Sequence, residues 1–423
     1  MEFRTLSFRH SGSRLSLLLT LSILGQCFGH GASAQERVLT TDSAGIELVF
    51  SRGPKLAGGD AWYLSAGPVL QIGKADGAEP FLFGNLWGAT ECADGTIVLA
   101  EGQSHELRVF SAEGEHLRTF GGRGNGPSEF RGPPWVTTAG SDTVVVWDPG
   151  IYRLTWFDLE GNLLRERALR SVVTALPISM FPRGNVWQFR QGGALLSIGP
   201  GNLGFGPGIR RSTRRVVLID DAGETVHDFG EVTAGLSVSK SSGGGRPTNV
   251  GSPFGPAVWP ALGPSPLSVA LGGDGAWEVQ WLDSEGQIVR ISRADIPRVY
   301  LSRELIGRER DRLRERVNQT TTLGQLQSAF DDLPLPDSVP AIGAMRFDRS
   351  GNLWVKRRRP SKEDGAAYDV LGPDGDWLTS ITIPAEIERI FEIGEDHLLG
   401  LWRDQMDVPY LRVYQLLKPE GPS

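Results

Sequence analysis

The sequence predicts an all-β protein, a β-propeller built from four-stranded antiparallel blades, and three observations predict it. First, a pattern of glycine, tryptophan and aspartate recurs 48 residues apart near the N-terminal end of the chain. Second, an alternating apolar strand that ends in a short acidic turn with glycine occurs five times. Third, the 55 glycines and 27 prolines lie between short apolar runs and follow no collagen period, which indicates many strands joined by turns.

The repeat is clearest when residues 73–101 are aligned with residues 121–149. Gly73 then matches Gly121, and Trp87 matches Trp135. The strands that follow end in acidic turns at Gly114, Gly161, Gly223, Gly286 and Gly375. One unit therefore reads strand, turn, strand, loop, strand, acidic turn, strand, which is the content of a propeller blade.

A sixth unit at the C-terminal end contains only three predicted strands, between residues 387 and 417. Residues 68–73 match the outer strand of a blade but precede the first complete unit, so we expect them to complete the last blade. The predicted fold is thus a six-bladed β-propeller whose ring is closed by an N-terminal strand. Residues 36–50 predict an additional hairpin that turns at residues 42–45, with no predicted docking site.

Three segments interrupt the repeat. Residues 191–214 and 235–266 are rich in glycine, proline and serine and predict long loops in or beside the third and fourth blades. Residues 302–318 predict one inserted surface helix with Ser302 as its N-cap. The predicted domains are a signal peptide at 1–34, an N-terminal hairpin or extension at 35–67, and the propeller at 68–418.

The N-terminal segment predicts export. Three arginines, at positions 4, 9 and 14, precede an apolar run at residues 15–24 that is too short to span a bilayer. Small residues at 32–34 predict cleavage before Gln35. The alternative is a lipoprotein anchored at Cys27, which Gln26 disfavours because it is not small. We expect a periplasmic or extracellular protein.

Charge and composition exclude several classes of partner. The net charge is −7, and removal of the signal peptide makes it more negative, so the sequence predicts no nucleic-acid partner. No later stretch predicts a transmembrane segment. After cleavage only Cys92 remains, in an apolar stretch, and we interpret it as a small buried core residue.

The run at residues 120–130 and the strands after it resemble an NHL-type propeller repeat. From residue 35 to 418 the chain resembles bacterial exported six-bladed β-propeller proteins, through residues 41–46, 123–130 and 402–408. That resemblance implies the fold and implies no particular activity.

Ligand-binding residues are predicted where the loops between blades meet the loops between the second and third strands. The polar side chains on these loops are Glu101, His105, Arg123, Asn125, Asp148, Tyr152, Arg153, Arg403 and Asp404. The alternative interpretation, that these groups only solvate loop tips, remains open. The histidines lack the spacing of a metal pair, and the sequence predicts no metal site. We interpret the strand tryptophans as packing residues.

Two functions fit these features. The first is an exported module that binds an unknown protein, peptide or small molecule on its loop face without a cofactor. The second is a lactonase-like, esterase-like or lyase-like enzyme that holds a divalent cation such as Ca²⁺ in the channel, with Glu101, Asp148 and Asp404 as candidate ligands. The glycine-rich run 121–126 does not predict a phosphate site, because no helix begins after it.

Overall fold

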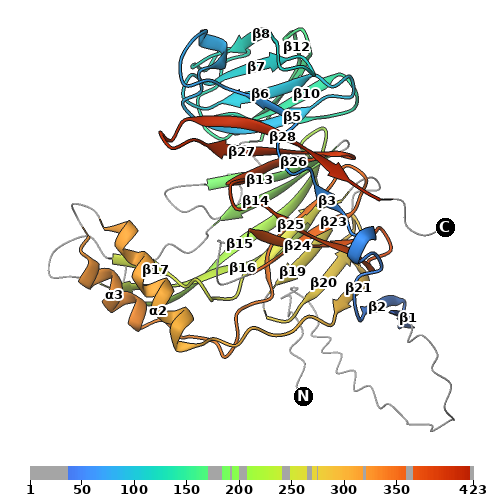
Figure 1. Cartoon of the computed structure of the whole chain (residues 1–423), viewed down its shortest axis with the longest axis vertical. Helices are drawn as coiled ribbons and strands as arrows, with labels where there is room; N and C mark the ends of the chain where they lie inside the picture. The colour runs from blue at the N-terminus through green and yellow to red at the C-terminus, as the bar shows by residue number, and fades with distance from the viewer. Residues whose placement is uncertain are drawn as a thin grey trace.

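Six antiparallel sheets make up most of the computed structural model, which describes residues 37–169, 183–190, 193–199, 207–240, 248–263, 269–273, 275–317, 321–358 and 365–419. The predicted signal peptide and Cys27 lie outside the described residues. Figure 1 shows the sheets as successive layers, with the first two together at one end of the molecule. Successive antiparallel sheets of about four strands are the architecture of a β-propeller, as the sequence predicts.

Each sheet is a consecutive stretch of chain with additions at some edges. The first two contain β5 (Leu86–Glu91), β6 (Ile97–Glu101), β7 (Glu106–Phe110), β8 (His116–Gly121), β9 (Trp135–Thr138), β10 (Thr143–Asp148), β11 (Arg153–Asp158) and β12 (Leu163–Ala168). The third contains β13 (Arg183–Arg190), β14 (Gly193–Gly199), β15 (Gly208–Asp220), β16 (Thr225–Lys240) and β17 (Thr248–Gly251).

The fourth sheet contains β18 (Val258–Leu262), β19 (Val269–Gly273), β20 (Glu278–Leu282) and β21 (Ile288–Ala294). The fifth contains β22 (Ile342–Phe347), β23 (Leu353–Arg357), β24 (Ala366–Leu371) and β25 (Trp377–Ile383). The last contains β26 (Arg389–Ile393), β27 (His397–Arg403) and β28 (Pro409–Leu417).

The acidic turns with glycine have the geometry that the sequence predicts. All five turn glycines have a positive φ, between 75° and 86°, which a side chain rarely tolerates. In three of the turns an aspartate side chain, from Asp158, Asp220 or Asp283, accepts a hydrogen bond from the backbone N–H four residues later. Each turn follows a register shift at the same place in the third strand. The repeat is therefore structural as well as compositional.

Two N-terminal segments join sheets that come later in the chain. β4 (Leu70–Ile72) pairs antiparallel with β28, and β3 (Tyr63–Leu64) pairs with the end of the same strand. The segment predicted at residues 68–73 thus occupies the outer edge of the last sheet. β1 (Val38–Ser43) and β2 (Ile46–Ser51) form the predicted hairpin, and β2 pairs parallel with β21 of the fourth sheet.

The structure corrects two predictions about the segments that interrupt the repeat. The described residues of 191–214 and 235–266 are mostly strand rather than loop: they belong to β14, to the 13- and 16-residue strands β15 and β16, and to β17 and β18. Residues 191–192, 200–206, 241–247 and 264–266 of the two predicted loops lie outside the described residues. The inserted region contains two α-helices, not one: α2 (Arg303–Asp311), extended by a 3₁₀ turn, and α3 (Leu323–Asp331). The Ser302 hydroxyl accepts from the Leu305 N–H, which confirms the predicted N-cap. Figure 1 shows both helices beside β17 at one side of the molecule.

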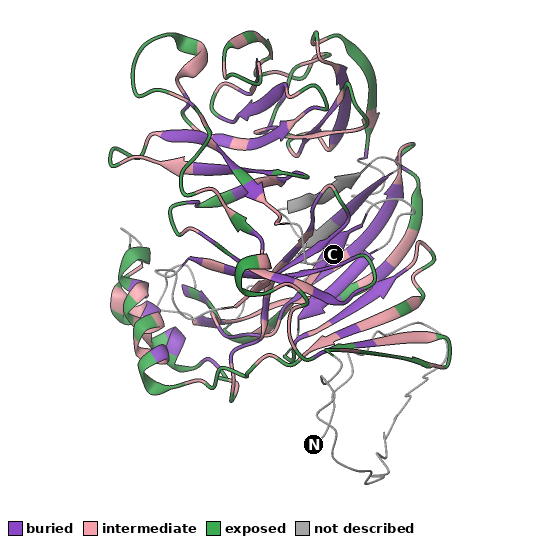
Figure 2. Ribbon diagram, turned by 45° about the vertical axis from the view of Figure 1, so that its right-hand side comes forward, coloured by how far each residue is buried: buried purple, intermediate pink, exposed green. Residues whose placement is uncertain are grey.

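Apolar side chains are buried between neighbouring sheets and under the helices. Figure 2 shows this burial along the strands, with exposed residues mainly at turns and edges. Cys92 is 2% exposed, and burial raises the pKa of its thiol to about 12, so it is the core residue that the sequence predicts. Trp62, Trp147, Trp156 and Trp354 are also buried, whereas Trp135 is 39% exposed.

Candidate functional site

The first strand of each repeat unit in chain order defines two ends of the structure, one where the strand starts and one where it finishes. β5, β9 and β26 lie side by side at their starts: the side chain of Val136 in β9 packs at Gly88 of β5, and β26 contacts β5. The connections between second and third strands lie at the same end, because those strands are antiparallel partners. We call this the loop end; it carries all nine predicted ligand-binding residues.

Glu101 is a structural acceptor at the loop end. It is 2% exposed, and its two carboxylate oxygens accept hydrogen bonds from the backbone N–H groups of Gly84, Asn85, Gln103 and Ser104 at 2.6–3.0 Å. Burial alone would raise the pKa of Glu101, but these hydrogen bonds hold it below its usual value. The carboxylate therefore fixes two turns.

Asp148 has the same role in the second sheet. It is fully buried and accepts hydrogen bonds from the N–H groups of Arg131, Gly132 and Gly150 at 2.7–2.9 Å. Asp404 accepts from the N–H groups of Met406 and Val408 and from the Tyr410 hydroxyl, and these bonds lower its pKa against the effect of burial. The three carboxylates considered as calcium ligands thus bind protein donors.

The loop at residues 122–130 is held from both adjoining sheets. Nδ1 of His105, which is 5% exposed, lies 2.8 Å from the Phe130 carbonyl, and Arg123 donates to the Gln103 carbonyl at 3.2 Å. Arg153 donates to the carbonyls of Gly126 and Glu129 from the other side. The structure thus brings His105, Arg123 and Arg153 together as supports of this loop, which presents Asn125 to solvent.

The remaining predicted residues lie in two separate turns. Tyr152 has a positive φ of 56° and packs its ring against Trp147. Arg403 pairs with Glu388 and Asp407, both at 3.4 Å.

Three residues at the loop end were missed by the sequence analysis as site residues. Trp87 and Trp135 start the first strands of neighbouring sheets, and their rings meet edge to face with centroids 5.7 Å apart. The exposed Arg389 starts β26, and its guanidinium lies 5.7 Å from the Trp87 ring centroid. The 48-residue repeat that aligns Trp87 with Trp135 was the available signal, although we interpreted both as packing residues. We call these three residues with Arg403 the mouth patch.

The opposite ends of the first strands contain a polar cluster centred on Arg349, in the β22–β23 turn. Arg349 pairs with Glu392 of β26 at 2.7 Å. It also donates to the Glu91 carbonyl and to the Thr138 hydroxyl, in the first and second sheets. The Arg349 side chain therefore links its own sheet to three others.

His397 belongs to this cluster. Nε2 lies 3.3 Å from Glu392, and Nδ1 lies 3.6 Å from Glu91 and 3.3 Å from the exposed Asp396. Burial opposes the charged imidazole, but these carboxylates raise the pKa of His397 overall. Burial also raises the pKa of Glu91, whereas hydrogen bonds from His397 and the Arg349 charge lower that of Glu392 despite burial.

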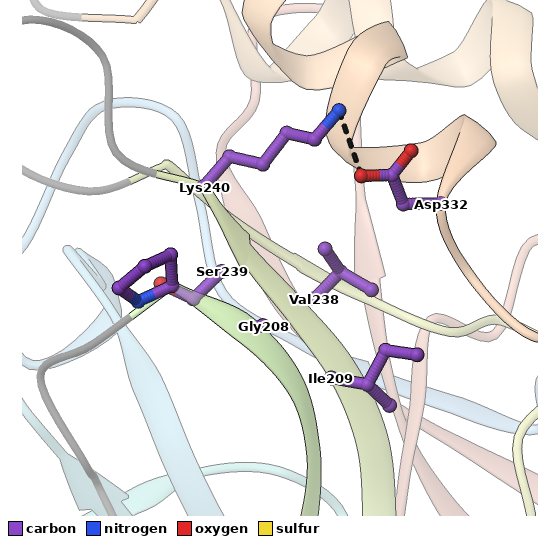
Figure 3. A pocket seen from close by; sticks show the side chains of 7 residues that line it. Gly208, Ile209, Val238, Ser239, Lys240 and Asp332 are labelled. Carbon is purple, nitrogen blue, oxygen red and sulfur yellow. Dashed lines mark ion pairs between the residues drawn. The ribbon is translucent and has the colours of Figure 1, made fainter.

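Two cavities lie away from the mouth patch. One, of about 290 Å³, lies between the first and last sheets and includes Glu91 in its lining. The other, of about 450 Å³, lies between the β15–β16 hairpin and Asp332, whose carboxylate pairs with Lys240 at 2.7 Å (Figure 3). Pro207 and Lys240 are the first and last residues of the described segment 207–240, so we base no site on this second cavity.

In the part of the chain that the structure describes, no three His, Cys, Asp or Glu side chains are placed to hold a metal ion. No helix among the described residues is long and apolar enough to cross a membrane. The fold and the site thus define a propeller-type protein with a polar, aromatic loop end.

No protein-family model matches the chain, and no curated protein matches its sequence. Among solved structures, a putative exported protein from Bacteroides fragilis is similar over 88% of this chain and 100% of its own, with 11% identity and a TM-score of 0.44. The aldose sugar dehydrogenase of Streptomyces coelicolor, with bound PQQ, has 10% identity over 85% of this chain and 100% of its own, with a TM-score of 0.41.

Virginiamycin B lyase from Staphylococcus aureus, in complex with quinupristin, has 10% identity over 82% of this chain and 98% of its own, with a TM-score of 0.38. These TM-scores are all below 0.5, so no functional statement about this chain rests on them.

Proposed function

We propose that this protein is an exported, closed six-bladed β-propeller that binds a ligand at its loop end. The pairing of β4 with β28 supports closure, because an N-terminal strand then completes the last blade. The contacts of Arg349 support a central axis, because one side chain can reach four sheets only where they converge. The N-terminal arginines and apolar run support export.

The observation that carries a binding function is the difference between the two ends of this axis. At the Arg349 end, the charged groups pair with one another across three sheets, and Arg349 also donates to the Thr138 hydroxyl of a fourth. At the loop end, turns are fixed by buried carboxylates while Trp135, Asn125 and Arg389 are exposed. A rigid surface with exposed polar and aromatic groups suits ligand binding, because little order is lost on association.

The alternative, a cation-dependent hydrolase or lyase, requires carboxylates that are available to a metal. Glu101 and Asp148 instead accept hydrogen bonds from backbone N–H groups of their own turn and of a neighbouring loop, and Asp404 accepts them from its own turn. A cation that displaced the donors of the buried Glu101 and Asp148 would cost about 1–3 kcal/mol for each donor left without its acceptor. This geometry favours the binding module.

Thermal unfolding of the processed protein tests the proposal. We expect millimolar calcium to leave Tm unchanged, and at least one class in a panel of oligosaccharides, organic acids and short peptides to raise it. Lactone and aryl-ester hydrolysis should stay at the buffer rate. A calcium-dependent rise in Tm together with calcium-dependent turnover would overturn the proposal in favour of the enzyme.

A further inference from the structure

We propose that the mouth patch binds a carboxylate carried on a ring, with Arg389 pairing the carboxylate and Trp135 packing against the ring. This inference rests on the proposed function and specifies its ligand. It begins from Arg389, which is exposed at the start of β26 and for which no ion pair or hydrogen bond is seen among the described residues. An exposed guanidinium can donate two parallel N–H hydrogen bonds to the two oxygens of a carboxylate.

The neighbours of Arg389 orient it and leave it available. Its guanidinium lies 5.7 Å from the centre of the Trp87 ring, which holds the side chain at the loop end. The nearby carboxylate of Glu388 pairs with Nε of Arg403 at 3.4 Å. The residue is exposed overall, but partial desolvation of its guanidinium and the charge of Arg403 lower the pKa of Arg389, against the charge of Glu388. Arg403 pairs with both Glu388 and Asp407, at 3.4 Å each, so among the described residues neither carboxylate is paired with the Arg389 guanidinium.

The tryptophans supply the second half of the site. Trp87 is half-buried, and its ring packs against Gly102, where a β-carbon would overlap the indole. Trp135 meets Trp87 edge to face and is 39% exposed. Arg389 and Trp135 thus both contact the Trp87 ring, and this arrangement favours a ligand with a flat apolar face and a charge at its edge. Sugar acids and aromatic acids both have this chemistry.

Isothermal titration of the processed protein with benzoate and with trigalacturonate tests the proposal and separates these two sources. Their neutral counterparts are benzamide and a galactose trisaccharide. We expect one of the acids to bind and its neutral counterpart to bind at least tenfold more weakly. We also expect Arg389→Ala and Trp135→Ala each to weaken binding at least tenfold, and Arg389→Lys to weaken it less.

Arg165→Ala is the matched control, because Arg165 lies 3.9 Å from the centre of the Trp156 ring in a different part of the second sheet. It should bind like the wild type, and the melting temperature of each variant reports whether it folds. Equal binding by acid and amide, or no effect of Arg389→Ala in a folded variant, would overturn the inference. If a compound without a carboxylate raises Tm in the ligand panel and Arg389→Ala does not weaken its binding, the carboxylate site is wrong but the binding function stands. Calcium-dependent turnover would instead overturn the proposed function itself.

Discussion

Replacing Glu101 by glutamine tests whether the loop-end carboxylates are structural. The substitution keeps the size of the side chain but replaces one carboxylate oxygen by an NH₂ group. One oxygen of Glu101 accepts from the N–H groups of Gly84 and Asn85, and the other accepts from those of Gln103 and Ser104. Whichever position the new NH₂ takes, two backbone donors lose their acceptor.

The expected cost follows from these pairs. A buried donor without an acceptor costs about 1–3 kcal/mol, so Glu101→Gln should lower the free energy of unfolding by about 2–6 kcal/mol. Asp148→Asn is the matched comparison. One oxygen of Asp148 accepts only from the Arg131 N–H, so an NH₂ group placed there leaves one donor unpaired, at about 1–3 kcal/mol. We therefore predict that Glu101→Gln destabilises the protein more than Asp148→Asn does.

Urea unfolding followed by tryptophan fluorescence measures both variants, and Glu115→Gln, at an exposed position of the β7–β8 turn, is the control. The control should stay within about 0.5 kcal/mol of the wild type. Because the pKa of Glu101 is lowered in the folded state, its contribution is present above the unfolded pKa of about 4.3 and is lost as pH falls through the folded value. Glu101→Gln as stable as the control at pH 7 would refute the structural role.

Three further predictions follow from other parts of the fold. Because the pKa of His397 is raised in the folded state, its contribution to the free energy of unfolding is complete below the unfolded pKa of about 6.5 and is lost as pH rises through the folded value. Urea melts should therefore show that His397→Gln destabilises the protein more at pH 5.5 than at pH 9. The exposed Glu395→Gln is the control, and equal losses at the two pH values would contradict this. Gly161→Ala should lower the free energy of unfolding by about 1–3 kcal/mol, because φ at Gly161 is 85° and a β-carbon there would lie 2.8 Å from the Phe120 ring. Gly53→Ala is the control and should change the free energy of unfolding little, because Gly53 has open space around it and no positive φ. Similar urea melts of the two variants would count against the turn geometry. Cysteines at Gln71 and Arg412, which are register partners in β4 and β28, should form a disulfide that shifts gel mobility and raises Tm, and failure to cross-link in the folded protein would count against the pairing of these strands.

The turns and the order of strands could be predicted from the sequence because their causes are local. A positive φ strongly favours glycine, so these turns are marked in the sequence by Gly114, Gly161, Gly223, Gly286 and Gly375. The outer strand at β4 was predictable because the last unit lacked one strand. The second helix was missed although Thr322 and Gln325 form a capping box, which is a recognisable signal. The long β15–β16 hairpin could not be predicted, because its glycines and serines resemble a loop and tertiary pairing decides otherwise.

The candidate site was less predictable because function depends on what each polar group contacts. The sequence places Glu101, His105 and Arg153 at the loop end, and the structure shows that they bind backbone groups of adjacent loops. Arg389 was not among the predicted residues. In the structure Glu388 pairs with Arg403, which lies in the next strand. The spacing of residues along one strand cannot reveal that Glu388 pairs with an arginine of the neighbouring strand.

The two ends of the first strands have different roles, one in stabilising the fold and the other in the proposed ligand binding. Trp87 and Glu91 belong to the same strand, β5, about 13 Å apart at roughly 3.3 Å per residue. At the Glu91 end, Arg349 and Glu392 join sheets between which the described residues form no paired strands, so their loss should loosen the packing of the sheets. At the Trp87 end, buried carboxylates order the turns locally, so an exposed arginine and indole can change without loss of the fold. Ligand specificity can therefore vary at the loop end while the Arg349 cluster maintains the arrangement of the sheets.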